Sequence, residues 1–131
     1  MKTAELSLFI IEDDPYFRET LIDVMALRGV PVTAVGTAVE GMRVLRAQKA
    51  KPSVIILDVQ LPDVDGLEVC RIIKRMDGLQ NTPVVLLSAA TNYSDPRDRA
   101  EGMLAGASVF LSKPITMEDL WTEIEALAQR R

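Results

Sequence analysis

The chain has 131 residues, of which 48% are hydrophobic and 26% are charged, a balance typical of one ordinary globular domain. Its formal net charge of -4 gives none of the excess basic charge on which non-specific nucleic-acid binding depends. It has no histidine, which excludes zinc–histidine sites and Ser-His catalytic triads, and its one cysteine, Cys70, cannot form an intrachain disulfide.

The chain opens with MKTAELSLFII, a short apolar run that meets acids at Glu12 and Asp13. Neither a signal peptide nor a membrane span fits that pattern, so we expect a cytoplasmic protein. Further along, Cys70 lies within an apolar helical pattern and is expected to be a core residue rather than a nucleophile.

Short apolar runs alternate with longer amphipathic segments along the chain. Most of the runs are almost continuously apolar, as in strands covered on both faces. The predicted strands are Leu6–Ile11, Val32–Val35, Val54–Leu57, Val84–Leu87 and Ser108–Leu111.

Helix signals follow each strand. Asp14-Pro15 and Asp95-Pro96 are typical of an N-cap followed by proline at the first helical position. Thr37 with Glu40, and Asp65 with Glu68, have capping-box spacing, and a last helix is expected after Thr116. The predicted helix stops are Gly29, Gly78 and Gly106.

Alternating strands and helices indicate an α/β fold with helices on both faces of a parallel sheet. For five strands, the leading candidate is the flavodoxin-like, three-layer doubly wound fold with strand order 2-1-3-4-5 and five helices. No linker or low-complexity tract divides the sequence, so residues 1–131 are expected to form one domain.

In this fold, ligands bind beyond the carboxyl ends of the strands, where strands 1 and 3 lie side by side. Glu12 and Asp13 follow strand 1, and Asp58 follows strand 3. Such carboxylates repel one another unless a cation lies among them, and hard oxygen ligands suit Mg²⁺. Ser88 after strand 4 and Lys113 near the end of strand 5 could hold a phosphate at the same edge.

Each of these residues also has a plainer interpretation. Glu12 and Asp13 could be solvated acids. A lone serine at a strand end, such as Ser88, usually has no functional role, and a lone lysine such as Lys113 is usually a solvated side chain. Asp58 follows the apolar run Val-Ile-Ile-Leu, where an unpaired carboxylate would be costly, so it favours a functional role. Asp14, next to Pro15, is assigned to helix capping rather than to the metal.

The whole chain resembles the bacterial two-component response-regulator receiver domain. Four segments carry the resemblance in order: an acidic pair after strand 1, an acceptor loop with its proline and glycine, a strand with Ser/Thr, and a strand 5 with Lys-Pro. They are 10–14 (IIEDD), 55–66 (IILDVQLPDVDG), 83–89 (PVVLLSA) and 106–114 (GASVFLSKP).

The resemblance implies a role for each matching residue. Asp58 would accept a phosphoryl group from a histidine kinase or a histidine phosphotransfer protein. Glu12, Asp13, Asp58 and the backbone carbonyl of Gln60 would bind Mg²⁺. Ser88 would bind a phosphoryl oxygen, Lys113 would pair with the acceptor or the phosphoryl group, and Lys113-Pro114 would be a cis peptide.

The conformational switch would involve Ser88 and Phe110. Many members of the family carry tyrosine at the position of Phe110. The readout face would be helix 4, strand 5 and helix 5, which could also form a homodimer. Ala90 and Gln60 stand at positions that influence how long the phosphoryl group survives. No membrane contact and no direct nucleic-acid binding by this domain are expected.

Other classes stay open at this point. An aspartyl-phosphate phosphatase of the haloacid dehalogenase type usually has a second aspartate where Gln60 stands here. A flavin or nucleotide module would need a glycine-rich phosphate loop after strand 1, where three acids lie instead. A degenerate receiver that only makes protein contacts is a further alternative. The cognate kinase, the output pathway, and whether the chain is a stand-alone protein or part of a longer regulator stay open.

Overall fold

The structure is a computed structural model, and it describes residues 6–89 and 96–129. The predictions for Ala90 and for the cap at Asp95 lie outside the described residues. Five parallel strands form one sheet in the order β2-β1-β3-β4-β5. The predicted flavodoxin-like order is therefore confirmed.

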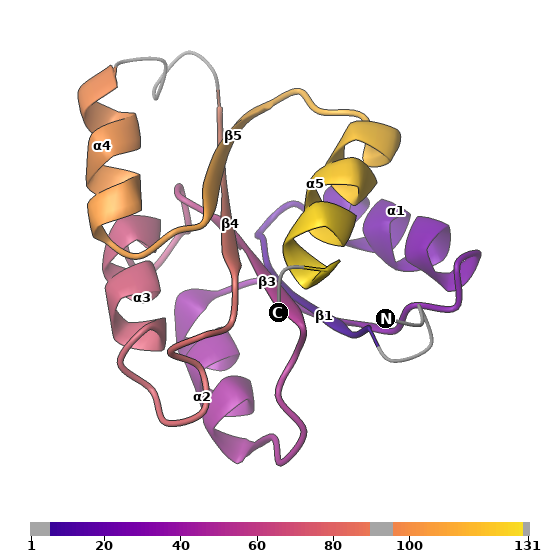
Figure 1. Ribbon diagram of the computed structural model, residues 1–131, viewed down its shortest axis with the longest axis horizontal. Helices are drawn as coiled ribbons and strands as arrows, with labels where there is room; N and C mark the ends of the chain where they lie inside the picture. Colours follow the sequence, from indigo (N-terminus) through magenta and orange to yellow (C-terminus); the bar gives the residue numbers. More distant parts are fainter. Residues whose placement is uncertain (1–5, 90–95, 130–131) are drawn as a thin grey trace.

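Strands and helices alternate along the described chain (Figure 1). The strands are β1 (Leu8–Ile11), β2 (Val32–Val35), β3 (Val54–Asp58), β4 (Val84–Ala89) and β5 (Val109–Lys113). The helices are α1 (Pro15–Ala26), α2 (Ala38–Ala47), α3 (Gly66–Ile73), α4 (Pro96–Leu104) and α5 (Met117–Gln129).

Strand bounds differ from the prediction mainly at the carboxyl ends. Asp58 is the last residue of β3 rather than the residue after it, and β5 continues through Lys113. The ladder includes the pairs Ser88↔Ser112 and Ala89↔Lys113, because backbone hydrogen bonding does not require apolar side chains. The predicted strand Ser108–Leu111 therefore ended two residues early, although Lys113 was expected near the end of this strand. Ser88, which was expected to follow strand 4, lies within β4.

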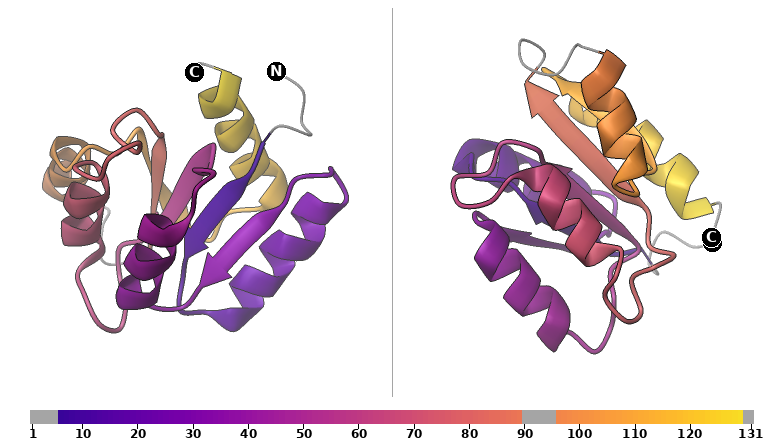
Figure 2. Two further views of the ribbon diagram at one scale, coloured as in Figure 1. Left: turned by 90° about the horizontal axis from the view of Figure 1, so that it is seen from below. Right: turned by 90° about the vertical axis from the view of Figure 1, so that its left-hand side faces the viewer.

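Alternating side chains of the sheet enter two separate cores. Phe9, Ile11 and Leu57 face α2 and α3, whereas Ile10 and Ile56 face the other core. Helices α1 and α5 cover that second face (Figure 1). The right-hand view of Figure 2 shows α2, α3 and α4 side by side over the first face.

The predicted helix ends are largely confirmed. Asp14 caps α1 by accepting a hydrogen bond from the Tyr16 amide at 3.0 Å. Gly29 and Gly106 have positive φ just beyond the ends of α1 and α4, which glycine adopts without steric penalty. The prediction of a helix stop at Gly78 was wrong, since α3 already ends at Ile73; Gly78 has positive φ in the turn that follows.

The predicted capping boxes are only half formed. Thr37 accepts from the Glu40 amide at 3.2 Å, but the Glu40 carboxylate binds Arg43 instead of returning to the cap. Glu68 likewise pairs with Arg71 at 3.2 Å. An arginine three residues further along the same helix gives each glutamate a charged partner, and this local pairing replaces the second half of the box.

Candidate functional site

An acidic cluster lies at the carboxyl edge of the sheet. Ile11 pairs with Leu57 in neighbouring strands, so the next residues along, Glu12 and Asp58, come out side by side. Glu12 is fully buried and Asp58 is 5% exposed, whereas Asp13 is exposed. One carboxylate oxygen from each of the three lies within 4.8 Å of those of the others. The predicted convergence of these acids is confirmed.

Lys113, the last residue of β5, gives this cluster a cation. Its Nζ donates hydrogen bonds to Glu12 Oε1 and, at 3.2 Å, to Asp58 Oδ2. The same Nζ lies 4.9 Å from the centroid of the Phe17 ring on α1, within cation–π range. The Lys113-Pro114 peptide bond is cis, as the resemblance implied.

Backbone amides hold the remaining carboxylate oxygens in place. Gln60 donates its N–H to Asp58 Oδ1 at 2.8 Å, and Asp14 donates its N–H to Glu12 Oε2 at 3.1 Å. Arg18 of α1 also donates to the backbone carbonyl of Glu12, at 2.7 Å. The two buried carboxylates are therefore fixed by short-range contacts on both oxygens.

Burial and close contacts shift the pKa values of both Glu12 and Lys113. Burial, with a contribution from the neighbouring Asp58, raises the pKa of Glu12 to about 7, although Lys113 and the Asp14 amide oppose the shift. Burial lowers the pKa of Lys113, but its contacts with Glu12 and Asp58 outweigh burial, so the net shift is upward. One ammonium group does not balance three clustered carboxylates.

The donor set fits a hard divalent cation. All side-chain ligand atoms in the cluster are carboxylate oxygens, and no histidine exists in the sequence to favour zinc or copper. Asp13 keeps the cluster open to solvent, which suits an ion such as Mg²⁺ that usually retains several waters. A cation at this position would also offset the repulsion among the three carboxylates.

The two predicted switch residues lie apart from these contacts. Ser88 is fully buried, and its hydroxyl donates to the backbone carbonyl of Ala89 at 3.2 Å. Within residues 6–89 and 96–129, Ser88 makes no hydrogen bond to Asp58 or Lys113. Phe110 is 7% exposed and packs in the core beneath α4, where a Cβ on Gly102 would come within 2.8 Å of its ring.

Sequence reasoning missed Arg18, Phe17 and Asp63. The contacts of Arg18 and Phe17 follow from the helical turn that starts at Asp14, so their nearness to the acidic pair was a usable signal. Asp63 binds the amides of Ala38 and Val39, more than twenty residues earlier in the chain. No local spacing could have indicated that contact.

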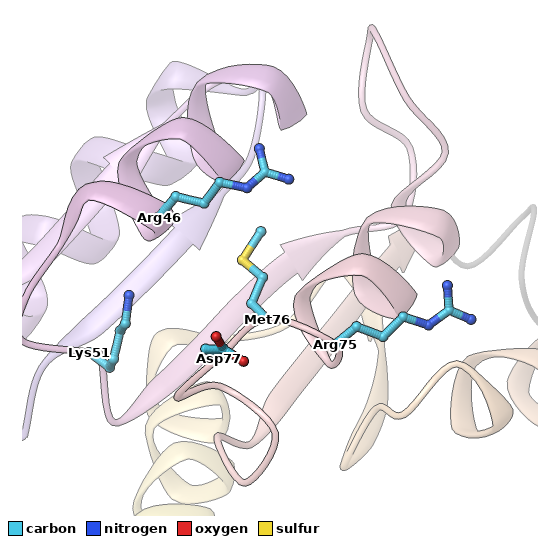
Figure 3. A pocket seen from close by; sticks show the side chains of 5 residues that line it. All are labelled: Arg46, Lys51, Arg75, Met76 and Asp77. Atoms are coloured by element: carbon cyan, nitrogen blue, oxygen red, sulfur yellow. The ribbon is translucent and has the colours of Figure 1, made fainter.

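A separate cleft of about 400 Å³ lies at the ends of α2 and α3, at the opposite edge of the sheet from the acids. Figure 3 shows the Arg75 side chain extending away from the others rather than converging with them. Lys51 donates to the Leu45 carbonyl at 2.7 Å near the end of α2, as expected for a cation at a helix C-terminus. The lining residues are Arg46, Lys51, Arg75, Met76 and Asp77.

The fold and the acidic edge define a receiver-type α/β domain, and comparisons with known proteins identify its family. Residues 8–125 match the family model described as "Response regulator receiver domain", so the chain belongs to that family. It is a receiver domain of two-component signalling.

Among curated proteins, the chain is similar to the transcriptional regulatory protein AfsQ1 of Streptomyces coelicolor, with 37% identity over 124 residues. It is 35% identical to the transcriptional regulatory protein GltR of Pseudomonas aeruginosa over the same number of residues. These matches cover 95% of this chain but 52% and 49% of the two relatives. The chain thus spans about half the length of the curated relatives it matches.

Solved structures of receiver domains and response regulators have the same fold as this chain. The signal receiver domain of a signal transduction histidine kinase from Syntrophus aciditrophicus is 32% identical, with a TM-score of 0.81, over 94% of this chain and 89% of that one. The chemotaxis response regulator CheY4 of Vibrio cholerae is 25% identical, with a TM-score of 0.82, over 93% of this chain and 98% of that one. No helix in the described part of the chain is long and apolar enough to span a membrane.

Proposed function

We propose that Asp58 accepts a phosphoryl group, and that the domain changes conformation in response. The observation that carries this proposal is the geometry around Asp58: a nearly buried carboxylate at a strand end, held by the Gln60 amide and the Lys113 ammonium, with Glu12 and Asp13 beside it. A carboxylate so fixed is oriented before any reaction, which lowers the entropic cost of attack.

The proposed donor is a phosphohistidine on a sensor histidine kinase or a histidine phosphotransfer protein. One oxygen of Asp58 forms a bond to phosphorus while the P–N bond of the donor breaks. The leaving imidazole keeps the electron pair of that bond and takes a proton from solvent. Lys113 lies beside the acceptor and can balance charge on the transferring oxygens.

Glu12, Asp13 and Asp58 would hold Mg²⁺ through their carboxylates, and Gln60 would contribute its backbone carbonyl. When bound, the cation neutralises charge on the phosphoryl oxygens. The same residues would catalyse slow dephosphorylation, and no other enzymatic turnover is proposed.

In the proposed response, Ser88 leaves its present hydrogen bond to the Ala89 carbonyl and binds a phosphoryl oxygen. Phe110, which packs beneath α4, follows this movement. The face formed by α4, β5 and α5 would then signal to a partner or an output domain, or form a homodimer. Phosphorylation can favour the active state only through contacts that are stronger in that state. We propose a cytoplasmic location.

Incubation with acetyl phosphate and Mg²⁺, followed by intact mass measurement, tests the acceptor. We expect one phosphoryl adduct on the wild type and on Asp77→Asn, a control at an exposed acid far from the cluster. Asp58→Asn should give none. A wild type without an adduct, or an undiminished adduct in Asp58→Asn, would contradict the proposal. Sustained release of phosphate from a phosphomonoester would indicate a phosphatase instead.

A further inference from the structure

An acid of the acceptor loop reaches across to a different helix. Asp63 lies between β3 and α3, yet its Oδ1 accepts the Ala38 amide and its Oδ2 accepts the Val39 amide, both at 3.0 Å. These are the first two residues of α2. Hydrogen bonds from the two amides lower the pKa of Asp63, so the carboxylate is ionised at neutral pH.

The helix already has a cap from its own chain. The Thr37 hydroxyl accepts the Glu40 amide at 3.2 Å, and the Thr37 carbonyl accepts the Gly41 amide at 3.0 Å. With Asp63, the first four amides of α2 all have partners, and a negative charge lies at the positive end of the helix. Thr37 gives the local cap, so the distinct contribution of Asp63 is to join the helix to the acceptor loop.

That loop carries Gln60, one of the residues that contact Asp58. Gln60 donates its amide to Asp58 Oδ1 and forms an antiparallel bridge with Asp65. Asp65 in turn accepts the Leu67 amide at 2.9 Å at the start of α3. The two ends of the loop are closely packed against each other, since a Cβ on Gly66 would lie 2.4 Å from the Asp58 carbonyl oxygen.

The middle of the loop has fewer restraints. Pro62 and Asp63 are exposed, and Leu61 and Val64 are only partly buried against the core. The two hydrogen bonds of Asp63 hold this segment to α2.

We propose that Asp63 is a positioning residue for the acceptor site: by tying the loop to α2, it keeps the backbone of Gln60 in place against Asp58. The proposal rests on the proposed function in one respect, namely that the Gln60 carbonyl helps to bind Mg²⁺. The effect of Asp63 on the Gln60 amide does not depend on any metal.

The test compares Asp63→Ala with Thr37→Ala in the full chain. Both remove a cap from α2 and should lower Tm by a similar amount, about 2–8 °C. Only Asp63→Ala should loosen the loop, so its Gln60 amide should exchange about tenfold faster without metal. Its dissociation constant for Mg²⁺, measured by NMR titration, should rise about three- to tenfold, below the range for groups that bind a metal ligand directly.

Asp63→Asn keeps one hydrogen-bond acceptor, so its Gln60 exchange rate and its dissociation constant for Mg²⁺ should lie between those of wild type and Asp63→Ala. This variant also replaces Asp63→Ala in the test if the alanine variant does not fold. Equal Gln60 exchange in Asp63→Asn and wild type, or equal acceleration in Asp63→Ala and Thr37→Ala, would overturn the proposal. A wild type that binds no Mg²⁺ would contradict the proposed function instead, and the exchange measurement would still decide the role of Asp63.

Discussion

Lys113 Nζ lies 3.2 Å from Asp58 Oδ2, although their strands β5 and β3 are separated by β4. The lysine side chain reaches across β4 and also contacts Glu12, which follows β1. A single ammonium group thus joins three strands at the edge where the acids gather.

Replacing Lys113 should therefore destabilise the metal-free domain. In Lys113→Ala, Glu12 and Asp58 face each other without their shared cation, and we expect a loss of about 1–3 kcal/mol in the free energy of unfolding. Phosphorylation by acetyl phosphate should slow at least about tenfold.

Denaturant unfolding and mass spectrometry measure the two effects. Lys51→Ala is a matched control, because that lysine binds a backbone carbonyl at the other edge of the sheet. A Lys113→Ala variant that is as stable as Lys51→Ala and is phosphorylated at the wild-type rate would contradict this role.

Mg²⁺ should stabilise the folded protein, since it neutralises acids that come together only on folding. At a concentration about ten times its dissociation constant, the gain is about 1.4 kcal/mol. Asp13→Asn removes one charge from the exposed side of the cluster and should reduce the gain. Thermal unfolding in MgCl₂, compared with NaCl at equal ionic strength, measures it. Equal unfolding temperatures in both salts would count against a metal site.

The contribution of Asp63 to stability should depend on pH. Its pKa in the folded protein lies below the ordinary value of 3.8, so its stabilising effect is present above that value and is lost as the pH falls through the lower, folded value. The stability gap between wild type and Asp63→Asn should be constant near neutral pH and narrow in acid. For Thr37→Ala the gap should not narrow in the same way, because a hydroxyl does not titrate. Parallel gaps for the two variants would refute this assignment.

Cys70 should be unreactive in the folded protein. Its side chain is fully buried, and burial raises the pKa of the thiol to about 11. At pH 8 a thiol reagent such as Ellman's reagent should label it only as fast as the protein opens, whereas labelling in denaturant should be rapid and complete. Rapid stoichiometric labelling of the native protein would show that the core around α3 is open.

Much of this fold could be predicted from the sequence, because its strands are covered on both faces and are nearly continuously apolar. The polar residues that end those runs, Glu12 and Asp58, consequently indicated the site. The bond between Asp63 and α2 could not be predicted, since it joins residues 24 and 25 positions apart. Nor could the hydrogen bond of Ser88 to Ala89, because the rotation of a hydroxyl leaves no trace in a sequence pattern.

A crystal structure with Mn²⁺ in place of Mg²⁺, together with beryllofluoride as a phosphoryl analogue, tests the central claim most directly. The anomalous signal of manganese should lie among the carboxylates of Glu12, Asp13 and Asp58. Density for the analogue should be continuous with the Asp58 carboxylate and close to Lys113. An anomalous peak elsewhere, with the acids apart and no analogue on Asp58, would contradict the proposal that this edge binds a metal and accepts a phosphoryl group.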